Sequence, residues 1–186
     1  MQQAAECNGR RDVAIGKEFG MASETSIRNV TTERLSDGSM IVRPDSIPWT
    51  PWALDGTYFK LLAINRRSGM WTVMMKIDPN TQTDNHYHFG DVHVYVTSGG
   101  HSYVHDRVNA EEINIECGSV AHEPTIGPDG QESFNIFYGG ISGTDAEGNP
   151  VGDYVDVEWM YKAAKANNAA GHLESPPPVR EMFFEG

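Results

Sequence analysis

The sequence predicts an all-β domain, folded as one small β-barrel, with a single helix near its C-terminal end. Short runs of β-branched and aromatic residues recur along the middle of the chain, and Gly, Pro and Asp separate them at regular intervals. One stretch with helical periodicity follows the last of these runs. With 186 residues, the chain has the length of one domain with a sizeable core.

The N-terminal quarter of the chain differs in composition from the rest. Residues 1–45 are polar and weakly patterned, and we expect a loosely structured arm with one short edge strand around residues 40–42. Two prolines and two tryptophans at 48–52 predict the entry into the compact domain, which we expect to span residues 46–171. Its strands are expected at 58–64, 71–77, 92–97, 101–105, 112–115 and 133–138.

The helix is expected from about residue 156 to 170. Val155, Trp159 and Ala163 fall on one of its faces, and Gly171 is well placed to end it. Residues 172–186 are then a tail with three consecutive prolines.

Composition argues against several classes of function. The net charge of −12, without any cluster of Lys or Arg, predicts no binding to nucleic acid or to a membrane surface. Cys7 and Cys117 lack a Cys-x-x-Cys spacing, which predicts neither a disulfide framework nor a thiolate zinc site. No stretch approaches the ~20 apolar residues of a membrane-spanning helix, and no signal-peptide core follows Met1. We therefore expect a cytoplasmic protein.

Histidines are concentrated in one part of the chain. Six of the seven lie between residues 86 and 122. His86 and His88 are two residues apart in a strand-like segment, so their side chains point to the same side. Two parallel imidazoles can bind one ion together, and this pair predicts a divalent-metal site.

The residues around the pair resemble the motifs of the cupin superfamily. His86-x-His88 and Gly99 match the first cupin motif, with His93 standing at its acidic position. Gly118 and Pro124 match the second motif, whose histidine position falls on Asp129. The resemblance implies a single jelly-roll barrel, and by analogy a homodimer or higher homo-oligomer.

A narrower resemblance covers roughly residues 51–161. Gly69-x-Trp71-Thr72, Tyr95 and Glu123, together with the two motifs, are similar to acetylacetone-cleaving and dihydroxyacetophenone dioxygenases. These enzymes hold iron(II) with three histidines and use O2 to cleave a carbon–carbon bond beside a ketone. The resemblance implies that His86 and His88 bind iron and that Glu123 lies near it, so that its neighbour His122 faces outward.

The third ligand is left open by the sequence. Two histidines and Asp129 would form the facial triad of non-haem iron oxygenases, with coordination positions free for substrate and O2. Asp129 also suits a plain turn in Gly127-Pro128-Asp129-Gly130. In that case His93 or Glu123 would complete the set.

The remaining candidates concern catalysis and the substrate pocket. Glu123 and His93 are expected to position the substrate or to move a proton. Tyr95 and Tyr103 are expected to shape the pocket. His101 shares a strand face with Tyr103, and that face either lines the cavity or is solvated.

Three functions are compatible with these residues. The leading one is an iron(II) dioxygenase acting on a small ketone or diketone. The second is an O2-independent isomerase, lyase or hydrolase that uses zinc, manganese or nickel. The third is a non-catalytic ligand-binding or regulatory cupin, although residues 1–45 lack an adequate amphipathic helix for partner binding.

Overall fold

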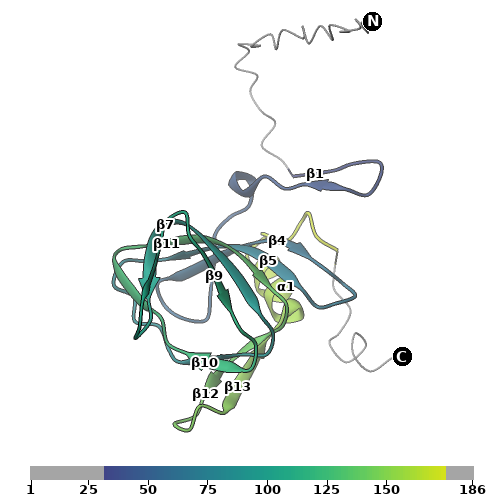
Figure 1. The fold of residues 1–186 in the computed structure, drawn as a ribbon. Helices are drawn as coiled ribbons and strands as arrows, with labels where there is room; N and C mark the ends of the chain where they lie inside the picture. The colour runs from purple at the N-terminus through teal and green to yellow at the C-terminus, as the bar shows by residue number, and fades with distance from the viewer. Residues whose placement is uncertain (1–31, 175–186) are drawn as a thin grey trace, which may run out of the picture.

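Two antiparallel β-sheets form the body of the protein in the computed structural model, which describes residues 32–174 (Figure 1). The larger sheet has the order β3-β4-β5-β11-β7-β8, with β9 also paired to β7. Its strands are β3 (Thr50–Pro51), β4 (Thr57–Ile64), β5 (Trp71–Ile77), β7 (Val92–Ser102), β8 (Arg107–Asn109), β9 (Ile113–Glu116) and β11 (Thr125–Phe137). The smaller sheet has the order β10-β6-β12-β13, from β6 (His86–His88), β10 (Val120–His122), β12 (Ile141–Thr144) and β13 (Pro150–Val155).

The all-β prediction is confirmed, and the barrel is built from two separate ladders rather than one continuously closed sheet. Residues from both sheets line a common cavity, so the sheets face each other. The strand expected at 71–77 is found with the same bounds, and the one expected at 58–64 begins one residue earlier.

In place of the two strands expected at 92–97 and 101–105, one strand, β7, runs from Val92 to Ser102, and residues 103–105 lie outside it. Gly99 lies inside it with a φ of 69°, and a Cβ there would be 2.0 Å from the carbonyl oxygen of Gly130 on β11. This glycine therefore permits a close approach of two backbones and does not end a strand.

Apolar side chains from β4, β5, β7 and β11 form the core beside the cavity. Phe59, Trp71, Val94 and Phe137 all belong to it, and the rings of Trp71 and Phe137 stack at 3.7 Å between centroids. The larger sheet is thereby buried on its inner face over most of its width.

Helix α1 (Val157–Ala166) packs beside β4 (Figure 1). Asp156 caps it, because its carboxylate accepts hydrogen bonds from the backbone N–H groups of Glu158 and Trp159 at 2.8 and 2.9 Å. The buried face consists of Val157, Met160 and Ala164, one position beyond the face we predicted. The difference arises because Val155 still belongs to β13, and the helix starts after it.

The segment before residue 46 contains more structure than expected. β1 (Glu33–Arg34) pairs with β2 (Met40–Ile41), and a short 3-10 helix, η1 (Pro44–Ser46), follows. The strand expected near residues 40–42 therefore pairs locally instead of at a sheet edge. Most of the predicted arm and of the tail lies outside the described residues.

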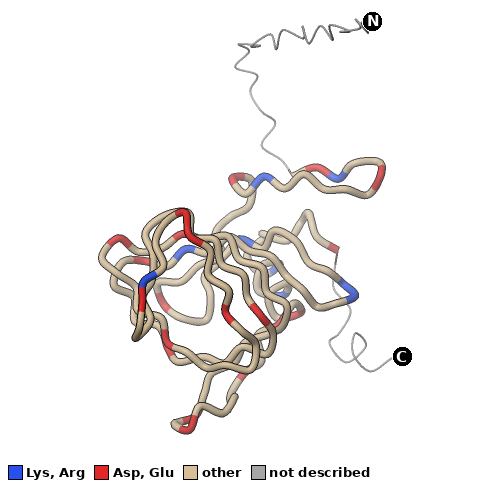
Figure 2. The backbone as a smooth tube through the Cα atoms, viewed as in Figure 1, with Lys and Arg blue, Asp and Glu red and all other residues tan. Residues whose placement is uncertain are grey.

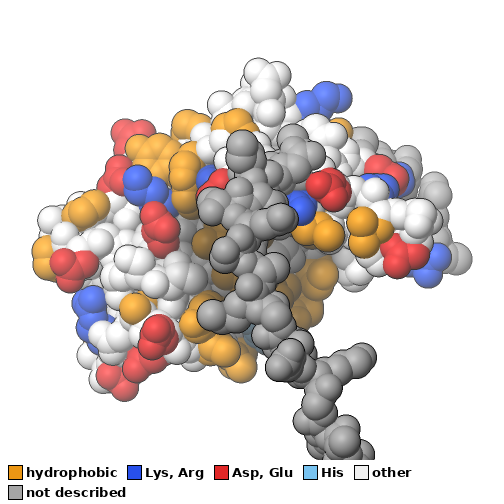
Figure 3. Space-filling model, turned by 90° about the horizontal axis from the view of Figure 1, so that it is seen from above, with side chains coloured by type: hydrophobic (Ala, Val, Ile, Leu, Met, Phe, Trp, Pro, Cys, Tyr) orange, Lys and Arg blue, Asp and Glu red, His pale blue; other side chains and the backbone are white. Residues whose placement is uncertain are grey.

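Acidic side chains outnumber basic ones around the fold (Figure 2). In the view from above, Lys and Arg stand singly or beside acidic residues, without a continuous basic patch on that face (Figure 3). No helix in residues 32–174 is both long enough and apolar enough to cross a membrane.

Candidate metal centre

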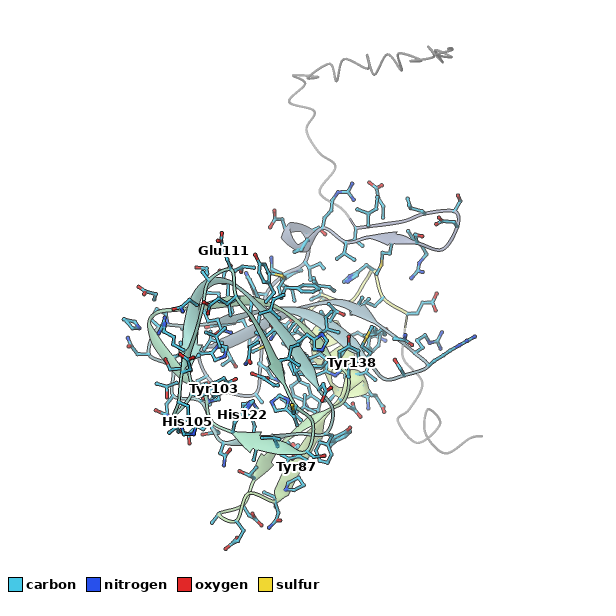
Figure 4. All side chains as sticks on the ribbon, in the orientation of Figure 1. Tyr87, Tyr103, His105, Glu111, His122 and Tyr138 are labelled. Carbon is cyan, nitrogen blue, oxygen red and sulfur yellow. The ribbon has the colours of Figure 1, made fainter. Side chains whose placement is uncertain are left out.

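Three histidines, His86, His88 and His122, lie close together, and Figure 4 labels His122 among them. His86 and His88 share one face of β6, and the pairing register places His122 of β10 directly opposite His86. The Nε2 atom of His122 lies 3.0 Å from Nε2 of His88 and 3.2 Å from Nε2 of His86. One ligand atom from each histidine lies within 4.8 Å of the others. Tyr87 lies on the opposite face of β6, between the two histidines in sequence.

Burial keeps these imidazoles uncharged. Burial, together with the neighbouring His86 and His122, lowers the pKa of His88 to about 3. It also lowers the pKa of His122 to about 4 and lowers the pKa of His86. The Nδ1–H group of His86 donates to the carbonyl oxygen of Asp84 at 3.0 Å, which leaves Nε2 with a free lone pair.

The three nitrogens fit a divalent metal ion. Two nitrogens bound at right angles to an ion, each about 2.1 Å from it, would lie about 3.0 Å apart. The observed separations of 3.0 and 3.2 Å agree with this spacing. A neutral imidazole whose second nitrogen donates a hydrogen bond, as in His86, is the form in which histidine binds metals. We therefore treat His86, His88 and His122 as a candidate three-histidine site.

A carboxylate from the opposite sheet faces this cluster. Oε2 of Glu116, at the end of β9, lies 3.6 Å from Nε2 of His88 and 3.8 Å from Nε2 of His122. Its Oε1 accepts hydrogen bonds from the hydroxyl of Tyr103 and, at 3.2 Å, from Nδ2 of Asn114. Because both histidines are neutral, these contacts are not ion pairs in the metal-free protein.

The environment of Glu116 favours its protonated form. Burial raises its pKa to about 7, although the hydrogen bonds from Tyr103 and Asn114 partly oppose this shift. Burial and the neighbouring Glu116 raise the pKa of Tyr103, so the tyrosine stays a hydrogen-bond donor. A carboxyl group with a pKa near 7 can both take up and release a proton at neutral pH.

Our reading of the sequence missed Glu116. Apolar and polar residues alternate along its strand, β9, so the sequence predicts that the isoleucines face inward, and the structure has the reverse orientation. Ile113 and Ile115 are 66% and 59% exposed, while Asn114 and Glu116 face inward. Polar residues on the inner face of a strand indicate a site in the cavity rather than packing.

The cluster lies at one side of a cavity of about 480 Å³. His86, His88 and Glu116 line it together with His101, Gln131 and Asn135, and most of the other walls are apolar. This size and composition are typical of a site for a small organic molecule.

The model of the ChrR Cupin-like domain family matches residues 37–142, more than half of the chain. The chain belongs to this family. No curated protein matches it. Among solved structures, an acetylacetone dioxygenase from Acinetobacter johnsonii is similar, with a TM-score of 0.58, 17% identity, and coverage of 88% of this chain and 99% of that one. An RmlC-like cupin from Ralstonia eutropha has a TM-score of 0.64, 21% identity, and coverage of 74% and 91%. These likenesses establish the cupin fold.

Asp129 lies apart from the histidine cluster. It is exposed in β11, where the register passes from Ile126 opposite His101 to Gln131 opposite Gly99. Residues 127–130 therefore form a β-bulge, in which four residues of β11 lie opposite a single residue of β7. The turn expected at these residues corresponds to this bulge. The structure brings His122, and not Asp129, beside His86 and His88, although we expected His122 to face outward.

Glu123 and His93 also lie outside the cluster. Glu123 is exposed and accepts a hydrogen bond from Nε2 of Gln82 at 2.7 Å, because strand alternation turns it away from the side that His122 occupies. His93 alternates with the buried Val92 and Val94, so it faces the outside of β7, where its ring meets that of Tyr138.

Of the three residues that we expected in the pocket, one faces outward and two face the cluster or the cavity. Tyr95 lies on the outer face of β7 and is 39% exposed. Tyr103 points toward the cluster (Figure 4), with its ring centroid 5.1 Å from that of His122. His101 is buried and lines the cavity.

Proposed function

We propose that the protein is a metal-dependent enzyme that uses O2 to cleave a carbon–carbon bond of a small ketone or diketone, with iron(II) held by His86, His88 and His122. The observation that carries this proposal is the convergence of three neutral imidazole nitrogens beside a buried carboxyl group. The similarity in fold to an acetylacetone dioxygenase supports the choice of this reaction type. Zinc, manganese or nickel could occupy the same ligands.

When bound, the ion would supply a Lewis acid for the ketone oxygen and the redox chemistry that O2 needs. Three protein ligands would leave the other coordination positions to small molecules. The mostly apolar walls of the cavity are suited to the hydrocarbon part of a small ketone.

Glu116 is the residue placed to handle protons. We propose that it removes a proton from the carbon next to the ketone, so that the C–H bond breaks and its electron pair forms the enolate. The proton stays on Glu116, where Tyr103 and Asn114 hold the carboxyl group in place. For a β-diketone, the overall reaction consumes one O2 and yields a carboxylic acid and an α-oxo aldehyde. One oxygen atom of the O2 ends in each product.

The same carboxyl group supports a second candidate function. Proton transfer by Glu116 beside a metal-polarised carbonyl would also serve an isomerase, a lyase or a hydrolase that needs no O2. The cavity fits a small-molecule substrate in either case, and the homo-oligomer stays a prediction.

The test is to load the full chain with iron(II) under nitrogen, add a β-diketone such as 2,4-pentanedione, and admit O2. The dioxygenase proposal requires O2 uptake that matches formation of the acid and the aldehyde, and its loss in His86→Ala/His88→Ala. Turnover of the ketone under nitrogen would instead identify the O2-independent enzyme. Absence of both, in protein with one iron per chain and for a panel of ketones, would refute the proposed function.

A further inference from the structure

A row of buried polar side chains lies on the inner face of the larger sheet. Gln131, Ser133 and Asn135 are 6%, 0% and 2% exposed, and they alternate along β11. Positions of this kind in a sheet that faces the core are normally apolar. Both Gln131 and Asn135 line the cavity that also contains His86, His88 and Glu116.

The next member of this row is His101 on the neighbouring strand β7. Its Nδ1 atom is 2.6 Å from Oε1 of Gln131, while Nε2 of Gln131 donates to the hydroxyl of Ser133 at 3.2 Å. An amide oxygen can only accept, so Nδ1 of His101 carries the hydrogen. Its Nε2 is then an acceptor, and it is buried without a partner among the described residues.

Asn135 presents a second acceptor of the same kind. Its Nδ2 group lies 2.7 Å from the thioether sulfur of Met75, which can accept a hydrogen bond but cannot donate one. The Oδ1 atom of Asn135 is buried and has no partner within residues 32–174. Leaving a buried acceptor unpaired is unfavourable, and two such acceptors in one cavity indicate a ligand that donates hydrogen bonds.

The charges around the cavity restrict that ligand further. None of the described residues that line it is Lys or Arg, whereas Asp84, Glu116 and Asp153 are all part of its wall. Burying a carboxylate or phosphate there would leave an uncompensated negative charge beside acceptors. The cavity is therefore suited to an uncharged donor.

We propose that His101, Gln131, Ser133 and Asn135 form a second binding subsite, which accepts hydrogen bonds from a neutral donor, a hydroxyl or amide N–H group, carried by the substrate away from its ketone. This inference rests on the proposed function for the ketone itself. It identifies the substrate as a ketone with a further donor group, rather than a purely alkyl diketone.

Binding can be measured without turnover on the full chain loaded with zinc(II), which binds imidazole nitrogens and has no redox chemistry. Three matched probes end in a hydroxyl, a methyl and a carboxylate: 6-hydroxyhexane-2,4-dione, heptane-2,4-dione and 4,6-dioxoheptanoate. Homologues with one or two more methylene groups allow for the span from the metal to the subsite. Isothermal titration should give at least about tenfold tighter binding for the hydroxyl than for the methyl probe at one or more chain lengths. The carboxylate should bind most weakly.

Substitutions assign the preference to the subsite. His101→Phe and Asn135→Leu should each reduce the preference for the hydroxyl several-fold and leave affinity for the methyl probe nearly unchanged. His93→Phe is the matched control, because His93 lies on the same strand but on its outer face. It should retain the full preference.

The binding results distinguish failure of the subsite from failure of the proposed function. Equal binding of hydroxyl and methyl probes at every chain length would overturn the subsite, with the acceptors satisfied by water alone, and would leave the proposed function standing. If none of the diones binds, the proposed function fails and the subsite with it. Should His101→Phe fail to fold, Asn135→Leu and the comparison of the hydroxyl and methyl probes on the wild type still test the subsite.

Discussion

His122 on β10 lies directly opposite His86 on β6, and their Nε2 atoms are 3.2 Å apart. Residues paired across an antiparallel ladder point to the same side of the sheet. The pairing therefore brings a third imidazole to a site for which His86-x-His88 supplies only two.

The first prediction separates His122 from Asp129 as metal ligands. His122→Ala should weaken binding of iron(II) or cobalt(II) by roughly 100-fold, because one of three nitrogen ligands is lost. Asp129→Ala removes an exposed carboxylate of the bulge and should change the affinity by less than about twofold. Titration of the metal-free protein under nitrogen measures both, and the reverse order would restore Asp129 as the third ligand.

Glu116→Gln should lower kcat by roughly 10²–10⁴, the usual contribution of a positioned acid or base. The amide keeps the shape of the side chain and its hydrogen bond to Tyr103 but cannot take up the proton. Iron content, measured on the same preparation, should remain near one per chain. Glu123→Gln is the matched control, because the side chain of Glu123 is exposed and accepts a hydrogen bond from Gln82, away from the cluster. Unchanged turnover in Glu116→Gln would remove this residue from the mechanism.

The raised pKa of Glu116 predicts a specific effect of pH on stability. In the folded protein the group keeps its proton up to about pH 7, whereas in the unfolded chain it ionises near its ordinary value of 4.5. Folded protein therefore binds the extra proton, and stability falls as pH rises through this window. Relative to the metal-free wild type, Glu116→Gln should be more stable by about 3 kcal/mol at pH 8 and by only about 1 kcal/mol at pH 5. Urea unfolding at the two pH values measures the difference, and an equal gain at both would contradict it.

Tyr103→Phe removes the hydroxyl that donates a hydrogen bond to the carboxyl group of Glu116. The hydroxyl of Tyr103 donates to Glu116 and thereby lowers its pKa, so its loss should raise that pKa further. The acid limb of the pH profile of kcat/KM should move upward by about one unit, the size of a typical hydrogen-bond effect. Tyr95→Phe removes a hydroxyl from the outer face of β7 and should leave the profile in place.

A stability prediction concerns the contact between β7 and β11. Gly99→Ala places a Cβ 2.0 Å from the backbone oxygen of Gly130, at a residue whose φ is 69°, so one of the two strands must move. We expect a loss of about 3 kcal/mol or more in the free energy of unfolding. Gly171→Ala, where nothing lies within 4 Å of the new Cβ, should have little effect. Thermal melting of the two variants compares them directly.

The sequence was sufficient for the class of fold and for two of the three histidines of the cluster. The bounds of β5 and the spacing of His86 and His88 depend on local sequence, and both appear in the structure as predicted. His122 was not predicted, because its orientation depends on which strand pairs with β6, and this pairing joins residues more than 30 positions apart. Asp129 was misjudged for a related reason. Its motif position suggests a ligand, but the bulge in β11 turns it toward solvent.

The proposed metal ligands and the proposed proton-handling residue come from opposite sheets. His86, His88 and His122 belong to two neighbouring strands of the smaller sheet, whereas Glu116 ends β9 and Tyr103 directly follows β7 in the larger sheet. An ion could therefore be retained by one sheet alone, even when the gap between the sheets widens. Catalysis, in contrast, requires the correct gap. If the proposed function holds, variants at the interface between the sheets should yield fully metallated protein that is slow. Metal content alone would then be a poor measure of how well the proposed active site is assembled.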